Sequence, residues 1–193
     1  MNKQVVFLNG PINSGKDALG KMLVDYFKEL NYPAQTERFK EKLYQHTAEL
    51  FKVDKDWLIE IANDRVNKEL PCDELHGHSP RQALIFTSEN VYKPIYGKDY
   101  FGKQTAKELK SGITFITDSG FYEEAMAVVK VVGVENCLVV NIYRDGCGYS
   151  SNDSRGYINL DGYSVPRLKL DNNSTLENAR DTILNALGVL GED

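Results

Sequence analysis

The chain has 193 residues, of which 41% are apolar and 26% charged, with a net charge of −5 and a mean hydropathy of −0.43. This length suits a single domain, 1–193, whose core needs no disulfide or metal staples. No apolar stretch approaches the roughly 18 residues that span a membrane, and the acidic balance argues against broad nucleic-acid binding. Three scattered cysteines do not form a disulfide framework, so we expect a cytoplasmic protein.

Strands and helices are predicted to alternate along the chain. The apolar run at residues 4–9 predicts a buried strand, and apolar residues three and four positions apart predict a helix at 16–30. Further elements follow in chain order: a strand at 34–39, helices at 41–51, 54–62 and 79–92, a strand at 113–117, a helix at 121–132, strands at 138–143 and 167–170, and a helix at 175–187.

Several helix ends carry recognisable sequence signals. Asp54 is suited to cap the helix that follows it, and Gly133 to end the helix at 121–132. Ser79 and Gln82 have the spacing of a capping box, and Pro80 between them suits the first helical position.

Strands that are apolar on both faces and alternate with helices predict a parallel sheet that is covered on both sides. We therefore expect a three-layer α/β fold with a mostly parallel, five-stranded sheet. In such folds, ligands bind beyond the carboxyl ends of the strands. Polar residues that follow the predicted strands are accordingly the candidates for a functional site.

A phosphate-binding P-loop is predicted directly after the first strand. The sequence Gly-Pro-Ile-Asn-Ser-Gly-Lys-Asp has the spacing G-x-x-x-x-G-K and opens the first helix. Consecutive N–H groups and the helix N-terminus would face the phosphates of ATP, and the lysine would reach the outer ones. The predicted ATP-binding residues of this loop are Gly10, Asn13, Ser14, Gly15, Lys16, Asp17 and Ala18.

Two carboxylates are candidate ligands for Mg²⁺. Asp17 stands where a serine or threonine usually offers a hydroxyl to the metal, and a carboxylate is also a hard oxygen ligand. Asp118 ends an apolar strand, where an acidic group can hold Mg²⁺ or the acceptor. Alternatively, Asp118 caps the helix that follows it. Glu124 lies about one turn along that helix and is a candidate for the acceptor site.

Arginines are candidates for neutralising charge during phosphoryl transfer. Arg81 lies in the first turn of the helix at 79–92, and Arg144 ends the strand at 138–143. Arg155 lies in a stretch at about 145–156 that is rich in Gly, Ser, Asn and Asp, as is typical of a mobile lid.

Lysines and aromatic residues interleave at 92–110. This composition is compatible with a track for a polynucleotide. A solvated helix face with aromatic residues turned into the core explains it as well, and we favour this second interpretation.

The residues also resemble a known family. The segments 10–17, 79–84, 96–102 and 170–176 together resemble bacteriophage deoxynucleoside monophosphate kinases. The resemblance implies an adenylate-kinase-like fold, ATP and Mg²⁺ as cofactors, a small-molecule nucleotide as acceptor, and the cytoplasm of a host cell as location. The implied roles are an acceptor-binding helical region at about 38–110, acceptor binding by Arg38, Lys40 and Arg81 of that region and by Glu124 beyond it, lid arginines at 144 and 155, and an adenine border that includes Asn172 and Asn173.

The resemblance has one departure, which leaves alternatives open. In the segment 118–125, Gly120 replaces an arginine of the family's pattern. Related phage kinases phosphorylate 5-hydroxymethyluracil within DNA, so modified DNA is an alternative acceptor. A nucleotide-binding regulator without catalysis is a third possibility. We expect a monomer or homodimer with no membrane partner, and catalytic roles for Lys16, Asp118, Arg144 and Arg155.

Overall fold

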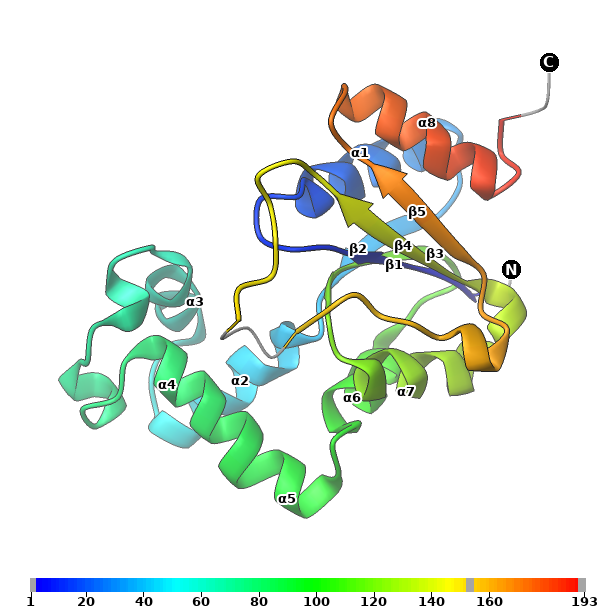
Figure 1. Ribbon diagram of the computed structural model, residues 1–193. Helices are drawn as coiled ribbons and strands as arrows, with labels where there is room; N and C mark the ends of the chain where they lie inside the picture. The colour runs from blue at the N-terminus through cyan, green and yellow to red at the C-terminus, as the bar shows by residue number, and fades with distance from the viewer. Residues whose placement is uncertain (1–2, 152–154, 191–193) are drawn as a thin grey trace.

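A five-stranded parallel sheet forms the centre of the protein (Figure 1). The computed structural model describes residues 3–151 and 155–190. The strands are β1 Lys3–Asn9, β2 Ala34–Glu37, β3 Gly112–Ser119, β4 Cys137–Tyr143 and β5 Arg167–Asp171, in the order β2-β3-β1-β4-β5. Every neighbouring pair is parallel, so the predicted three-layer α/β fold is confirmed.

Helices cover both faces of the sheet because β1 is apolar on both. Val6 and Leu8 pack with α1 (Lys16–Glu29) and α8 (Leu176–Ala186). Val5 and Phe7 pack on the other face, with α6 (Tyr100–Glu108) and α7 (Tyr122–Val132). Figure 1 shows these two helix layers above and below the sheet. The helices thus cover the faces of the sheet and leave the carboxyl ends of the strands accessible to a ligand.

A separate helical region extends beside the sheet and has its own core. It contains α2 Lys40–Phe51, α3 Lys55–Asn63, α4 Pro80–Ile85, a π-helix Phe86–Tyr92 and α5 Lys93–Tyr96. Short 3₁₀ helices lie at Asn67–Glu69, Asp73–Leu75, Val134–Asn136 and Asp161–Tyr163. In the part of the chain that the structure describes, no helix has the length and apolar character to cross a membrane.

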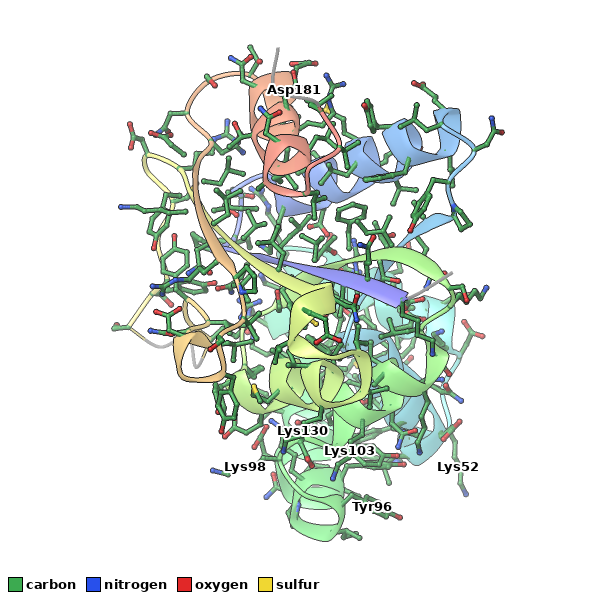
Figure 2. The ribbon with its side chains drawn as sticks, turned by 90° about the vertical axis from the view of Figure 1, so that its right-hand side faces the viewer. Lys52, Tyr96, Lys98, Lys103, Lys130 and Asp181 are labelled. Atoms are coloured by element: carbon green, nitrogen blue, oxygen red, sulfur yellow. The ribbon has the colours of Figure 1, made fainter. Side chains whose placement is uncertain are left out.

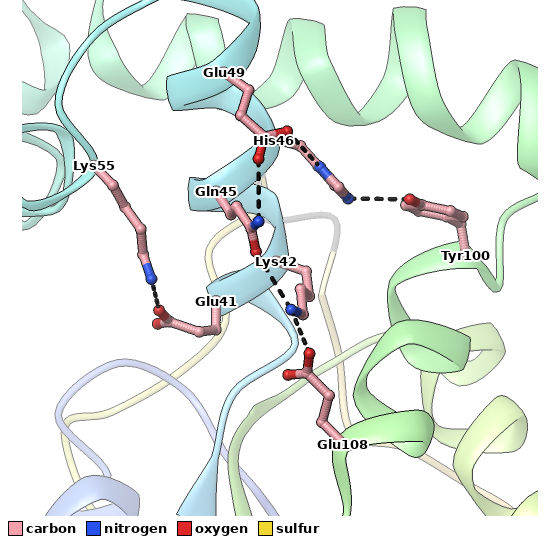
Figure 3. A network of polar contacts seen from close by, with 8 residues as sticks. All are labelled: Glu41, Lys42, Gln45, His46, Glu49, Lys55, Tyr100 and Glu108. Atoms are coloured by element: carbon pink, nitrogen blue, oxygen red, sulfur yellow. Dashed lines mark hydrogen bonds and ion pairs between the residues drawn. The ribbon is translucent and has the colours of Figure 1, made fainter.

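Polar contacts bind α2 to its neighbours on two sides (Figure 3). The pairs are Glu41 with Lys55 of α3, Lys42 with Glu108 of α6, and His46 with Tyr100 of α6. These contacts connect α2 to α3 within the helical region and to α6 in the helix layer beneath the sheet.

The predicted helix caps are confirmed. The Asp54 carboxylate accepts a hydrogen bond from the Trp57 amide, and Ser79 and Gln82 form the expected capping box. Gly133 is the residue at which α7 ends.

The helix predicted at 79–92 continues further than expected. It changes to π-helical geometry at Phe86 and runs on through α5 to Tyr96. Pro94 has no N–H to donate to the preceding turn, so a regular α-helical ladder cannot pass through this point. The sequence analysis assigned no element to 100–108, where α6 lies.

Candidate active site

The P-loop joins β1 to α1 and wraps tightly. Gly15 has a φ of 96°, a left-handed conformation that favours glycine. A Cβ at Gly10 would lie 2.6 Å from Ser14 Oγ and 2.9 Å from the carbonyl oxygen of Ile142. Both glycines of the motif are therefore required by the loop itself.

Lys16 is held at the mouth of this loop. Its Nζ donates a hydrogen bond to the carbonyl oxygen of Pro11 at 2.8 Å. Burial lowers the pKa of the ammonium group, whereas the neighbouring Asp17 carboxylate raises it. A partly desolvated cation interacts with phosphate more strongly than one in bulk water.

The predicted ATP-binding residues meet on one side of the P-loop. The Asn172 side chain donates to the Ser14 carbonyl at 2.8 Å, and an Arg144 guanidinium nitrogen lies 3.3 Å from the Asn13 carbonyl. Asn173 accepts from the backbone amide that follows Arg144, at 2.8 Å. Residues about 130 to 160 positions apart in the sequence are thus brought to the same loop.

Ala18 lies further along, in the first turn of α1. It lines a groove of about 350 Å³ that also includes Leu176 and Arg180 of α8. Its side chain is exposed.

Asp118 is a helix cap, but of a different helix from the one considered in the sequence analysis. Its two carboxylate oxygens accept hydrogen bonds from the backbone amides of Phe39 and Lys40, at 2.9 and 3.0 Å. These amides belong to the first turn of α2, where N–H groups have no partner within the helix. Burial raises the pKa of Asp118, and the two hydrogen bonds oppose that shift.

The predicted Mg²⁺ ligands Asp17 and Asp118 both lie near Lys16, because the charge of each raises the pKa of that lysine. Asp17 accepts hydrogen bonds from Thr117 and Arg38, both at 2.9 Å and both on its Oδ1. No described residue donates a hydrogen bond to its Oδ2, so this oxygen is available as a ligand. The described residues contain no cluster of three or more metal-ligating side chains. Mg²⁺ nevertheless fits here, because this ion is commonly held by one or two carboxylates together with phosphate oxygens and water.

A cavity of about 800 Å³ opens beside the P-loop. Among its described lining residues, six are basic and five acidic, although the whole chain carries a net charge of −5. The basic residues are Lys16, Arg38, Lys40, Lys93, Lys98 and Arg155. Arg38 and Lys40, two of the predicted acceptor-binding residues, therefore line this cavity.

Glu124 faces this cavity from α7 and is only 6% exposed. Burial, together with the negative charge of Asp118, raises the pKa of Glu124 to about 8. The ammonium group of Lys93 opposes that rise; it pairs with Glu89 at 2.6 Å and lies 4.9 Å from the centre of the Phe121 ring. At neutral pH the Glu124 carboxyl is thus mostly protonated and uncharged.

Arg155 reaches the cavity from the predicted lid. Its positive charge contributes to the lowered pKa of Lys16, so the two cations lie near each other. The lid predicted at about 145–156 includes residues 152–154, which lie outside the described residues.

Arg81 lies away from the cavity. Its Nε donates to Glu69 Oε1 at 2.7 Å, and the residues known to line the cavity include Leu84 and Ile85, one turn further along, but not Arg81. This ion pair turns the guanidinium toward the 3₁₀ helix Asn67–Glu69. Arg38 and Lys40 are the predicted acceptor cations that the fold places in the cavity.

The sequence analysis missed several residues at this site. Glu89, Lys93 and Phe121 line the cavity, and Thr117 donates to Asp17. Only Thr117 had a visible signal, because it directly precedes the carboxylate that ends β3. The other three depend on the π-helical geometry and on how α5 faces α7.

No protein family matches the chain, and no curated protein is similar to it in sequence. The chain is similar in structure to the APS kinase of Mycobacterium tuberculosis in complex with AMPPNP and APS, with a TM-score of 0.51 and 10% identity over 96% of this chain and 98% of that chain. It is also similar to the shikimate kinase of Aquifex aeolicus, with a TM-score of 0.46 and 18% identity over 97% and 99% of the two chains. Together with the parallel sheet and the P-loop, the first likeness shows that the chain has the fold of the P-loop kinases.

Proposed function

We propose that this protein transfers the γ-phosphoryl group of ATP to a deoxynucleoside monophosphate. The observation that carries the proposal is the cavity next to the P-loop, with Lys16 at the junction of the two and Arg38, Lys40 and Arg155 among its lining residues. A volume of about 800 Å³ suits a nucleotide-sized ligand. The phage kinase resemblance supplies the acceptor class.

Each part of the site has a role in this proposal. The P-loop amides and Lys16 hold the outer phosphates of ATP. Arg155, from the segment between β4 and β5, adds a second positive charge near these phosphates. Asp17 and Asp118 would hold Mg²⁺, which neutralises phosphate charge when it is bound. Arg38 and Lys40 would hold the phosphate of the acceptor.

The transfer needs no general base. An oxygen of the acceptor phosphate attacks the γ-phosphorus while the bond to the β-phosphate oxygen breaks, and ADP leaves with that electron pair. A phosphate dianion has no proton to lose in this step. Because Glu124 is mostly protonated near neutral pH, it adds little negative charge beside two phosphate groups.

A DNA kinase acting on 5-hydroxymethyluracil is the second candidate. It is favoured by Lys98, which lines the cavity, and by Tyr96, which is 55% exposed two residues earlier. A hydroxyl acceptor would need a base, however, and in this proposal Asp118 is already assigned to Mg²⁺ while each of its oxygens also accepts a backbone amide. In addition, Lys103 in the same segment is paired with Asp99. We therefore favour the free nucleotide.

A side-by-side transfer assay tests the proposal. Labelled ATP is offered with each deoxynucleoside monophosphate, and separately with DNA containing 5-hydroxymethyluracil. We expect ATP-dependent labelling of at least one free nucleotide and little labelling of DNA. Labelling of DNA alone would assign the DNA kinase activity, and the absence of any transfer with intact ATP binding would favour the regulator.

A further inference from the structure

Gly120 follows the carboxyl end of β3 and is buried. Its φ lies outside the left-handed region, so φ alone does not require glycine here. A Cβ at this position would nevertheless lie 2.8, 2.9 and 3.1 Å from the Cβ, Cγ and Cδ of Arg155. Carbon atoms that are not bonded prefer separations of about 3.5–4.0 Å. The aliphatic part of the Arg155 side chain can therefore occupy its position only because Gly120 has no side chain.

The backbone next to Arg155 is fastened at the same place. The Gly156 amide donates to the carbonyl oxygen of Gly120 at 3.2 Å. The side chain of Asn9 donates to the Gly156 carbonyl at 3.1 Å and accepts from the Ile158 amide at 2.7 Å. Asn9 is fully buried and ends β1 directly before the P-loop. These contacts hold the segment against the carboxyl ends of β1 and β3.

The consequence concerns the phosphate site. Arg155 is an exposed residue on a segment without regular secondary structure, yet its side chain lines the same cavity as Lys16. A forked guanidinium can bind two phosphate oxygens at once, but only where its position is set. A stabilising cation that is in place before the substrates bind needs no reorganisation during the reaction.

We propose that Gly120 is a positioning residue for Arg155: its bare Cα admits the arginine stem, its carbonyl holds Gly156, and the guanidinium is thereby set beside Lys16 for phosphoryl transfer. This inference rests on the proposed kinase function. It assigns a role to the one position where the chain departs from the motif that it otherwise resembles.

The test is a double-mutant cycle between the two positions. Gly120→Ala should lower kcat by about tenfold to 10²-fold, because a displacement on the order of 1 Å at a reacting group has costs of this size. Arg155→Ala should lower kcat by about 10²-fold. In the double variant, Gly120→Ala should add little, because no guanidinium remains to be displaced.

Gly162→Ala is the matched control. A Cβ at Gly162 would meet nothing within 4 Å, and its φ also lies outside the left-handed region. Its kcat should equal that of the parent. Thermal unfolding of each variant separates displacement of Arg155 from loss of the fold.

Hydrogen exchange of the Gly156 amide in the parent protein provides a second measurement that does not depend on a folded variant. The hydrogen bond to Gly120 should slow exchange well below the rate of an unprotected glycine. An unprotected amide, a Gly120→Ala variant as active as the parent, or independent losses in the double variant would each overturn the inference while leaving the kinase function intact. A parent protein that transfers no phosphoryl group would overturn the proposed function, and this inference with it.

Discussion

At the scale of single residues, the site combines groups whose charge is set by burial. Lys16 is an ammonium whose pKa burial lowers, whereas Glu124 is a carboxyl whose pKa burial raises. Both face one cavity, and the opposite shifts have the same cause, since low-dielectric surroundings disfavour the charged form of either group. The ammonium of Lys16 donates to the Pro11 carbonyl and lies near the carboxylates of Asp17 and Asp118. The carboxyl of Glu124, in contrast, forms no ion pair with a described residue.

Lys16→Ala should reduce kcat by about 10²-fold or more, because it removes one electrostatic stabiliser of the transferred group. The melting temperature should stay near that of the parent, since the ammonium contacts the loop and not the core. Steady-state kinetics and thermal unfolding measure the two effects. Lys28→Ala, in the last turn of the same helix, is the control. A Lys16→Ala variant with parental turnover would remove this lysine from the site.

Glu124 should make the fold less stable as the pH rises. The folded protein keeps the proton of this carboxyl up to about pH 8, whereas the unfolded chain releases it near the ordinary pKa of 4.5. Between these values the unfolded state binds fewer protons, so the free energy of unfolding falls with rising pH, by up to about 1.4 kcal/mol per pH unit.

Glu124→Gln should remove that fall, since an amide has the shape of the protonated acid and does not titrate. The variant should be more stable than the parent at pH 8.5 and similar to it at pH 4.5. Urea unfolding at a series of pH values measures this, with Glu123→Gln on the same helix as control. Parallel pH profiles for the parent and Glu124→Gln would contradict the raised pKa.

At the scale of elements, the site is assembled by contacts between the ends of strands and helices. The β5–α8 turn supports the P-loop through Asn172, and the end of β3 caps α2 through Asp118. Helices α6 and α7 approach closely at Gly102, whose added Cβ would lie 2.3 Å from the carbonyl oxygen of Glu124. These junctions fix where the cavity residues lie.

Gly102→Ala should destabilise the protein although it improves helix propensity. The propensity gain is about 1 kcal/mol. The new methyl group, however, would meet backbone atoms of α7 that cannot move away, and overpacking of this kind costs about 1–3 kcal/mol. Urea unfolding should therefore show a net loss, and Gly162→Ala should show none. Increased stability of Gly102→Ala would mean that α6 and α7 can separate without cost.

Arg144→Lys should lower kcat severalfold even though the charge is kept. Arg144 ends up beside the P-loop, with its guanidinium near the Asn13 carbonyl at 3.3 Å. Lysine is a point charge and cannot bind two oxygens in a fork. Steady-state kinetics compare it with Arg167→Lys, a surface residue paired with Asp161. Unchanged kinetics for Arg144→Lys would exclude a forked contact with phosphate.

At the scale of the whole molecule, the lysines of the segment at 92–110 bear on the choice between a free nucleotide and DNA as the acceptor. Figure 2 shows Lys98, Lys103 of α6 and Lys130 of α7 in the lower part of the view, where Tyr96 also lies, and Asp181 of α8 at the top. Two of the five lysines of the segment at 92–110 are paired with acidic side chains, Lys93 with Glu89 and Lys103 with Asp99. These ion pairs reduce the positive charge that the segment offers to a polynucleotide, and the net charge of −5 opposes binding of a polyanion further.

Turnover should depend only weakly on salt. Replacing Lys103, Lys107 and Lys130 together by Gln should leave the turnover of a free nucleotide within a few-fold of the parent. A protein that binds DNA releases counterions, so its affinity falls by orders of magnitude between about 50 and 200 mM salt. The assay is run at both salt concentrations with nucleotide and with DNA. Salt-sensitive labelling of DNA that the triple variant loses would contradict the free-nucleotide acceptor.

The sequence by itself determined the features that depend on neighbours in the chain. The P-loop, the caps at Asp54 and Ser79, the order of the five strands, and hence the α/β class follow from spacings of a few residues. Such local patterns act through the backbone geometry of one element, so they can be read without knowing the fold.

Only the tertiary structure decided which distant residues meet. Asp118 caps α2 and not the helix that follows it, Arg81 pairs with Glu69 outside the cavity, and the stem of Arg155 lies against Gly120. Each of these contacts depends on packing between different elements, from 12 residues apart for Arg81 and Glu69 to 79 for Phe39 and Asp118. They are set by the approach of α2, α4 and β3, which no local spacing encodes.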